Sequence, residues 1–244
     1  MIENEYYTVE NSWHIQLIVA LGYASLIFSL KMMMRSMSLP NSIKKILPTV
    51  IYWHNISLSL ASTIMGVLIV YETVIDGRYN SFYDAACRVT PNVGVYYFVN
   101  QCYIWSKIWE FLDTVFLCLN RKQVIFLHFW HHMTTFALAS VVFNFPSGAF
   151  AYINCFIHTL MYLHYAHPRR VFRPIMTTLQ IIQFLVVIGI HLYTYFAGCH
   201  ESVNLLFTEF LIDLFLCSSY LVLFMNFYLQ QYIKPRNTNN KKKE

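Results

Sequence analysis

The feature that most constrains this chain is a series of apolar stretches long enough to cross a bilayer. A membrane core needs roughly 20 helical residues, and seven stretches approach or exceed that length: 14–34, 48–71, 93–119, 123–143, 149–166, 174–196 and 203–232. Charged residues make up only 12% of the 244 residues, about half the fraction usual in soluble domains. We therefore predict an all-α polytopic membrane protein, a single domain over residues 1–244 with seven transmembrane helices.

The basic residues predict how these spans are oriented. Cytosolic loops are enriched in Lys and Arg, and 14 of the 17 basic residues fall in the first, third and fifth loops and the C-terminal tail. We therefore expect a cytosolic C-terminus and a lumenal or external N-terminus. The acidic start, with Glu3, Glu5 and Glu10, lacks the basic region of a removable signal peptide.

The expected cytosolic tail, residues 233–244, ends in the letters KKKE. Lysines three and four places from the end match a dilysine-type retrieval signal, so we predict the endoplasmic reticulum membrane. A basic tail that binds anionic lipid is the alternative interpretation.

The third span carries ionisable residues, which cost several kcal/mol in a membrane unless they are paired or hydrated. At 100° per residue these side chains share an arc of about 120°: Lys107, Glu110, Asp113 and Thr114. An ion pair between Lys107 and Glu110 would be purely structural, and it would leave Asp113 without a partner. The face is therefore a candidate functional site.

The next three spans also carry polar faces. The fourth presents three histidines within about 100°: His128, His131 and His132. Metal binding, nucleophilic or acid–base catalysis and proton relay all remain open for them. The fifth span presents Asn154, His158, Met161, Tyr162 and Tyr165 on a similar arc, and the sixth presents Thr177, Gln180 and Gln183. The glutamines have a second interpretation as interhelical hydrogen-bonding groups.

These polar faces are expected at one depth. With a rise of 1.5 Å per residue, four side chains lie roughly 10–15 Å inside the cytosolic boundary: Asp113, His131, His158 and Gln180. Their convergence predicts a buried reaction chamber that opens toward the cytosol.

The four segments together resemble the motifs of the ELO family of very-long-chain fatty acid elongases, the membrane 3-ketoacyl-CoA synthases. The pattern KxxExxDT matches residues 107–114, HxxHH matches 128–132, NxxxHxxMYxYY matches from residue 154, and TxxQxxQ matches 177–183. They occur in the family order. One departure is His164, which stands where the family usually has the first tyrosine of YxYY.

This resemblance implies a fold and a reaction. Six of the seven helices would surround a narrow acyl-chain tunnel. The chain would be a very-long-chain 3-oxoacyl-CoA synthase, an acyltransferase that condenses malonyl-CoA with a long acyl-CoA and releases CO2 and CoA. No metal or other cofactor is expected, because both CoA esters are substrates. Expected partners are these esters, membrane lipid, the ketoacyl reductase, dehydratase and enoyl reductase of the elongation cycle, and a second copy in a homodimer; nucleic acid is not expected.

Within that chemistry the residues receive expected roles. A neutral imidazole can attack a thioester, and His131 is the expected acyl-carrying nucleophile, while His158 would steer the malonyl group. The residues expected to orient and polarise them are His128, His132, Asp113 and Asn154. Those expected to contact substrate are Lys107 and Glu110, which would also pair, Tyr162, Tyr165, Gln180 and Gln183, and the basic residues Arg121, Lys122, Arg169, Arg170 and Arg173. The basic residues are candidates for holding CoA phosphates or are simply topology determinants.

Two further expectations concern the lumenal side. The resemblance implies a disulfide between Cys87 and Cys199, which both fall in lumenal loops, an oxidising compartment. Near the lumenal end of the last span, Glu209 and Asp213 either meet His191 or line the blind end of the tunnel. Residues there, such as His191 and Tyr195, are expected to set product chain length.

Other functional classes fit less well. A His-box di-iron lipid oxidase, a desaturase or hydroxylase, would use histidine and carboxylate ligands, but such membrane enzymes need about eight histidines, by analogy with their family. A receptor would not need clustered intramembrane histidines beside two carboxylates. We also find no inverted repeat with broken helices, as a transporter would have.

Overall fold

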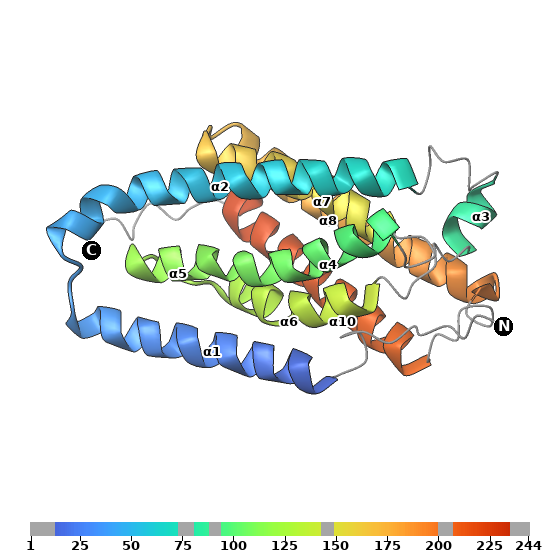
Figure 1. Cartoon of the computed structure of the whole chain (residues 1–244), viewed down its shortest axis with the longest axis horizontal. Coiled ribbons are helices and arrows are strands. Elements are labelled where there is room, and N and C mark those ends of the chain that lie inside the picture. Colours follow the sequence, from blue (N-terminus) through green and yellow to red (C-terminus); the bar gives the residue numbers. More distant parts are fainter. Residues whose placement is uncertain (1–12, 73–80, 88–93, 143–148, 200–206, 235–244) are drawn as a thin grey trace.

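The computed structural model describes residues 13–72, 81–87, 94–142, 149–199 and 207–234. All secondary structure in these ranges is helical: α1 Trp13–Ser36, α2 Asn41–Val70, α3 Phe82–Cys87, α4 Gly94–Trp109, α5 Phe111–Leu119, α6 Phe126–Val142, α7 Ala149–Ala166, α8 Phe172–Phe196, α10 Phe207–Tyr228, and a π-helical turn Leu229–Ile233. The long helices run along the longest axis of the molecule (Figure 1). The expected all-α class is therefore confirmed for the described residues.

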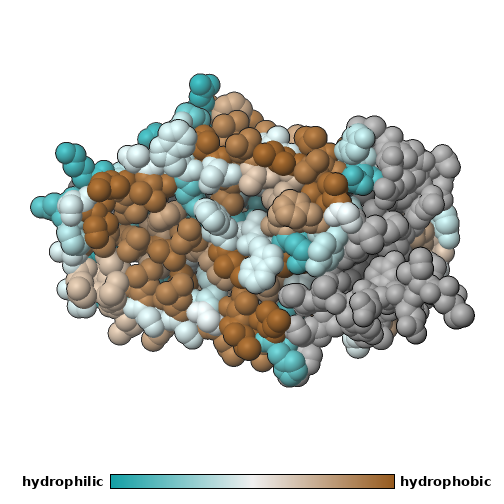
Figure 2. All heavy atoms as spheres, in the orientation of Figure 1, coloured by the Kyte–Doolittle hydropathy of each residue, from teal (hydrophilic) through white to brown (hydrophobic). Residues whose placement is uncertain are grey.

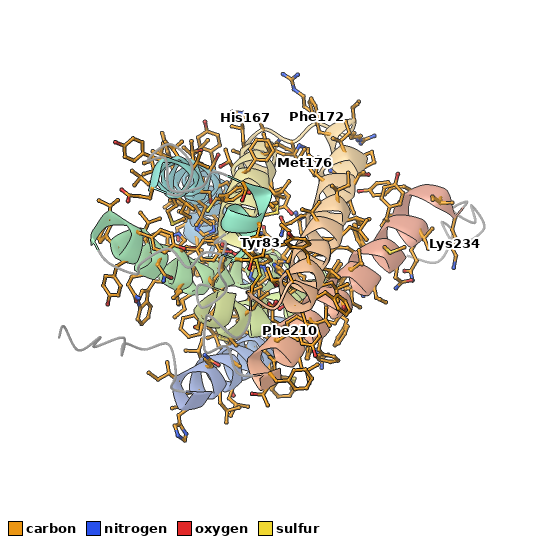
Figure 3. The ribbon with its side chains drawn as sticks, turned by 90° about the vertical axis from the view of Figure 1, so that its right-hand side faces the viewer. Tyr83, His167, Phe172, Met176, Phe210 and Lys234 are labelled. Atoms are coloured by element: carbon orange, nitrogen blue, oxygen red, sulfur yellow. A yellow bond between two sulfur atoms is a disulfide. The ribbon has the colours of Figure 1, made fainter. Side chains whose placement is uncertain are left out.

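Most of the long helices form a closed ring. Taken in order around it, α2 packs on α4, α4 on α6, α6 on α10, α10 on α8, α8 on α7, and α7 again on α2. Figure 3 views this ring along the helices, with α10 and α2 on opposite sides. Helix α1 packs on α5 and α6 and lies at one edge of the bundle (Figure 1). Such a ring provides the interior in which the polar faces meet.

Four helical segments are long and apolar enough to cross a membrane: His14–Ser36, Asn41–Val70, Phe172–Phe196 and Phe210–Ile233. The other three expected spans correspond to α4 with α5, α6 and α7, which are each at most 18 residues long. These three carry three of the four polar motifs, whereas the fourth, at residues 177–183, lies on the longer α8. A membrane protein is supported by these helices, whereas seven crossings remain a prediction.

The expected third span, 93–119, is not one continuous helix. Helix α4 ends at Trp109 and α5 begins at Phe111, with Glu110 in a turn between them. The Asp113 N–H donates to the Glu110 carbonyl three residues earlier, at 3.0 Å, instead of to the residue four earlier. Tightening of this kind often marks a functional site in a helix. Here the break lies at Glu110, one of the two carboxylates that the sequence singled out.

The second span is longer than expected. Helix α2 begins at Asn41, seven residues before the expected start at 48, and it contains Pro48. Lys44 and Lys45 therefore belong to the helix rather than to a loop. The helix continues through Pro48, although proline has no N–H and the hydrogen bond to the residue four earlier is lost there. The last expected span, 203–232, is described only from Phe207 onward.

The outer surface of the bundle is apolar. Hydrophobic atoms cover much of the face in Figure 2, and several hydrophilic atoms project at the end where α1 passes to α2. Side chains more than 60% exposed include Ile18, Phe28, Trp53, Phe98 and Phe215. Large exposed apolar areas are unusual in soluble monomers. Lipid is the environment that fits this surface.

Two apolar clusters hold the ring together. One joins α2, α4, α6 and α7 around Tyr103 and Phe136, and the other joins α6, α7, α8 and α10 around Phe184 and Tyr220. Helices α2 and α7 approach closely at Gly66, where an added Cβ would lie 3.2 Å from the Cys155 Cβ. Small residues permit such approach between membrane helices. The clusters therefore fix the positions of the polar helices.

Candidate active site

The polar faces meet in one cavity inside the ring. Its volume is about 620 Å³, and side chains from α2, α5, α6, α7, α8 and α10 line it. All six residues expected to be catalytic are among them: Asp113, His128, His131, His132, Asn154 and His158. Glu110, Tyr162, Tyr165, Gln180 and Gln183 line it too. The structure thus brings together residues that the sequence separates by up to 73 positions.

His131 has a cavity-lining imidazole without a polar partner in the described residues. Its Nδ1 is buried and accepts or donates no hydrogen bond there. The ring is held by packing instead, 4.9 Å between centroids from Tyr220 and 6.2 Å from Phe224, both on α10. An imidazole that is positioned by apolar contacts keeps its nitrogens available for chemistry. His131 is therefore suited to react with a substrate in this cavity.

Of the two other histidines of α6, His128 has a hydrogen-bond partner in the described part of the chain and His132 does not. The His128 and His132 rings lie 4.3 Å apart between centroids. His128 Nε2 lies 2.8 Å from the Thr114 hydroxyl, which is itself 2.9 Å from the Tyr23 hydroxyl of α1. His132 is buried, and its Nδ1 has no partner among the described residues. His128 is thus fixed by a hydroxyl chain, whereas His132 lines the cavity and shares with His131 an Nδ1 that is unpartnered within the described ranges.

His158 is oriented by a buried network at the break between α4 and α5. Its Nδ1 lies 3.2 Å from Glu110 Oε1, the same oxygen that accepts a 2.9 Å hydrogen bond from Lys107 Nζ. Lys107 also donates to Asn154 Oδ1 at 3.1 Å, and the Tyr103 hydroxyl donates to that oxygen at 2.9 Å. Because the partner of one ring nitrogen determines the role of the other, Glu110 sets which face of His158 is open to the cavity.

Lys107 does not line the main cavity. It borders a small neighbouring void, and its ammonium lies over the Tyr103 ring, 4.4 Å from the centroid. Its expected pairing with Glu110 is observed, whereas its expected contact with substrate stays a prediction that this position does not favour. Lys107 precedes the α4–α5 break and borders the small void, whereas Glu110 lies at the break and lines the main cavity.

Asp113 has two partners where the sequence predicted none. His54 Nε2 lies 2.9 Å from Oδ1, and the Tyr162 hydroxyl donates to Oδ2 at 2.8 Å. His54 belongs to α2 and is buried, and the sequence analysis missed it. The signal was present, since an ionisable residue inside the apolar stretch 48–71 is a functional candidate by the same reasoning that singled out Asp113.

The basic residues divide into two groups. Lys122 and Arg173 line the cavity. Arg121, Arg169 and Arg170 do not, and all three are exposed. Arg121 has a positive φ of 54° and donates from Nη2 to the Met37 carbonyl at 2.9 Å. The expected CoA contact is therefore supported by position only for Lys122 and Arg173, because the other three point to the surface of the bundle.

The rim of the cavity contains α7 and α8 residues. Gln180 Nε2 lies 3.3 Å from the Met161 sulfur, and Gln183 Oε1 is buried without a partner among the described residues. The atypical His164 lines the same cavity and lies 6.2 Å from Tyr165 between ring centroids. A histidine at this position therefore still contributes to the cavity wall.

Toward the opposite end of the bundle, a disulfide and a histidine–aspartate contact each join two segments. Cys87 at the end of α3 and Cys199 after α8 form a disulfide, with Cα atoms 5.1 Å apart, which is the pairing that the resemblance implied. Between α8 and α10, His191 Nδ1 contacts Asp213 Oδ2, and Cys217 Sγ lies 3.7 Å from Asp213 Oδ1. Of the alternatives for Asp213, contact with His191 is thus the observed one.

Metal ligation can be judged from the positions of the donor atoms. Within the described ranges, one group of at least three His, Cys, Asp or Glu side chains brings its ligand atoms within 4.8 Å of one another: His191, Asp213 and Cys217. The cavity histidines do not converge in this way. A pair of iron ions needs a convergent set of His and carboxylate donors, so the geometry of the cavity does not favour the di-iron alternative.

Comparison with known proteins agrees with the motif pattern. A family model described as the GNS1/SUR4 family, ELO, matches residues 8–240. The chain belongs to the ELO family. It is 30% identical to fatty acid elongase A of Dictyostelium discoideum, over 92% of this chain and 85% of that protein. It is 37% identical to fatty acid elongase 3 of Trypanosoma cruzi, over 64% and 57%, and 30% identical to very long chain fatty acid elongase 3 of Homo sapiens, over 57% and 55%.

Proposed function

We propose that this ELO protein is a fatty acid elongase that catalyses the condensing step, as a very-long-chain 3-oxoacyl-CoA synthase. A long-chain acyl-CoA and malonyl-CoA would give 3-ketoacyl-CoA, CO2 and CoA. The observation that carries the proposal is the shared cavity, in which an unpartnered His131 imidazole and a Glu110-oriented His158 face the same space. Family membership and the relatives' names support the same reaction class.

The first half-reaction is acyl transfer to His131. Its imidazole attacks the thioester carbonyl, a bond forms from nitrogen to the acyl carbon, and the carbon–sulfur bond breaks. CoA leaves as a thiolate, which takes a proton from the solvent. Covalent catalysis of this kind divides one difficult step into two. Packing of Tyr220 and Phe224 against the ring keeps the nitrogen aimed into the cavity.

The second half-reaction is decarboxylative condensation. Loss of CO2 from malonyl-CoA leaves an enolate, whose carbon attacks the acyl group and frees His131. The developing oxyanion needs positioned donors. Asn154 is suited to this, because Tyr103 and Lys107 occupy its Oδ1 and leave its amide NH2 for the cavity. His158, held by Glu110, is the second group near the malonyl thioester.

The setting of the enzyme follows from the charge pattern and the family. We infer seven crossings, an endoplasmic reticulum location, a lumenal N-terminus and a cytosolic C-terminus. The retrieval signal lies outside the described residues. The acyl chain would extend from the cavity toward the lumenal end of the ring, and the product would pass to the reductase and dehydratase enzymes of the elongation cycle. A homodimer is a further expectation.

Product analysis with the purified protein tests the function. We expect radiolabelled malonyl-CoA and a panel of acyl-CoAs to give 3-ketoacyl-CoA and labelled CO2 without added iron or reductant. His131→Ala should lower the rate at least about 1000-fold. Without the covalent nucleophile, only binding and the other polar groups of the cavity still accelerate the reaction. His167→Ala is the matched control, because His167 packs on Tyr52 outside the cavity. Normal condensation by His131→Ala would reject the mechanism.

A further inference from the structure

A chain of four side chains crosses from α4 through α2 to α5 and α7 at the cavity wall. The Trp109 indole N–H donates to His54 Nδ1 at 3.1 Å, His54 Nε2 lies 2.9 Å from Asp113 Oδ1, and the Tyr162 hydroxyl donates to Asp113 Oδ2 at 2.8 Å. His54 and Tyr162 are buried. The Asp113 carboxylate is therefore held at both of its oxygens, by His54 on one side and by Tyr162 on the other.

The direction of each hydrogen bond follows from donor chemistry. An indole nitrogen can only donate, so His54 Nδ1 must accept and cannot carry a proton. The imidazole proton is then on Nε2, which donates to Asp113. Trp109 thus fixes the tautomer of His54, and His54 supplies one of the two hydrogen bonds that hold Asp113.

Asp113 retains capacity for a further ligand. An ionised carboxylate offers about four acceptor sites, and the described partners use two of them. Its side chain is 14% exposed, and it lines the cavity. A carboxylate that served only to join helices would not need to be exposed to a cavity. The carboxylate is therefore accessible from the cavity and can accept a further hydrogen bond there.

The cavity follows one side of α5 and thereby places Asp113 along the substrate path. Glu110, Asp113, Phe116 and Asn120 line it in succession, and Lys122 follows in the turn. Asp113 is one turn from Glu110, which holds His158, and about 13 Å of helix separate Glu110 from the end of α5. A CoA thioester with its phosphates near Lys122 and its carbonyl near His158 must bring its pantetheine arm past Asp113.

We propose that His54 is a positioning residue that, together with Tyr162, aims the Asp113 carboxylate at an amide N–H of the pantetheine arm of a bound CoA thioester. This rests on the proposed function, because that function supplies the CoA thioester. Pantetheine carries two amide N–H groups, and a carboxylate is the stronger kind of acceptor for such a donor. The contact would place the thioester one turn further along, at His158 and His131.

Two amide variants test the proposal. In His54→Gln the side-chain NH2 reaches the position of Nε2 and still donates to Asp113, whereas in His54→Asn the side chain is one methylene shorter and cannot. The probe is S-hexadecyl-CoA, a thioether that retains pantetheine and cannot be cleaved. We expect His54→Asn to raise its Kd roughly 10-fold, the size of one hydrogen bond to a charged group, and His54→Gln to bind within about threefold of the wild type.

Unliganded melting temperatures separate positioning from stability. The proposal requires the two amide variants to melt alike, because only the reach of the donor differs between them. Equal Kd values for both variants would overturn it, and so would a parallel loss of affinity and stability. If His54→Asn does not fold, Tyr162→Phe takes its place, because that change removes the other donor to Asp113. We expect Tyr162→Phe to weaken the binding of S-hexadecyl-CoA by a similar factor.

The wild-type protein distinguishes failure of the inference from failure of the function. Binding of S-hexadecyl-CoA with the expected variant pattern, but no condensation of malonyl-CoA, would reject the proposed function and retain the role of His54. Condensation with no difference between His54→Asn and His54→Gln would reject the role of His54 and retain the function. If the wild type neither binds S-hexadecyl-CoA nor condenses malonyl-CoA, both are rejected.

Discussion

Two histidine–aspartate pairs each join two helices in the described part of the bundle, and their surroundings differ. His54 of α2 meets Asp113 of α5, and His191 of α8 meets Asp213 of α10. The Asp113 side chain is 14% exposed at the cavity wall, whereas the Asp213 side chain is 0% exposed and lies beside Cys217. The same pair of side chains therefore occurs at the cavity wall in one place and fully enclosed between helices in the other.

The surroundings explain this difference. Asp113 lies beside polar groups of α6 and α7, and its second oxygen is held by Tyr162. Asp213 borders the apolar cluster of Phe184, Leu216 and Tyr220. A buried charge in an apolar region is stable only when it is paired. We therefore expect changes at Asp213 to appear in stability and changes at Asp113 to appear in activity.

The largest expected effect is a loss of protein stability when the enclosed pair of His191 and Asp213 is broken. His191→Leu leaves the Asp213 carboxylate without its histidine, and breaking a buried pair in this way costs about 3–5 kcal/mol. Thermal unfolding in detergent measures the loss, with activity normalised to folded protein. The double variant His191→Leu, Asp213→Leu is the control, because replacement of both partners by apolar residues should recover most of the stability. A single variant as stable as the wild type would contradict the structural role.

A smaller stability effect is expected from the disulfide at the same end. Cys87 and Cys199 are 112 residues apart, and a crosslink over a long loop typically stabilises by about 2–4 kcal/mol. Cys87→Ser should lower the unfolding temperature in non-reducing conditions by the amount that a reductant lowers it in the wild type. Cys102→Ser is the matched control, because that thiol is free. Condensation activity below the unfolding temperature should be unchanged.

The smallest effect on stability is expected at the open pair. Asp113→Asn keeps an amide oxygen for His54 but removes the charge that faces the cavity. We expect the catalytic efficiency with CoA substrates to fall roughly 10-fold, the value of one hydrogen bond to a charged group, with little change in unfolding temperature. Steady-state kinetics of the purified variant measure it. If Asp113→Asn instead unfolds like His191→Leu, the contrast between the two pairs is wrong.

The candidate site could be predicted from sequence to a large extent because its residues lie at helical spacing inside apolar segments. His128, His131 and His132 share one face of a single helix, so spacing alone placed them together. The contact between His54 and Asp113 could not be predicted from spacing. The two residues are 59 positions apart and belong to different helices. The break at Glu110 was equally hidden, since residues 93–119 have the pattern of one continuous span.

By itself, the sequence determined that the chain is helical and apolar, which polar residues lie within its spans, and that those residues share a depth. These properties are local, because they depend only on residue type and on the 1.5 Å rise and 100° turn of a helix. Only the tertiary structure decided that Asp113 has partners, that Lys107 lies outside the cavity and that Asp213 is enclosed. Each of these depends on which helices pack side by side, and contacts between distant segments leave no periodic trace in a single sequence.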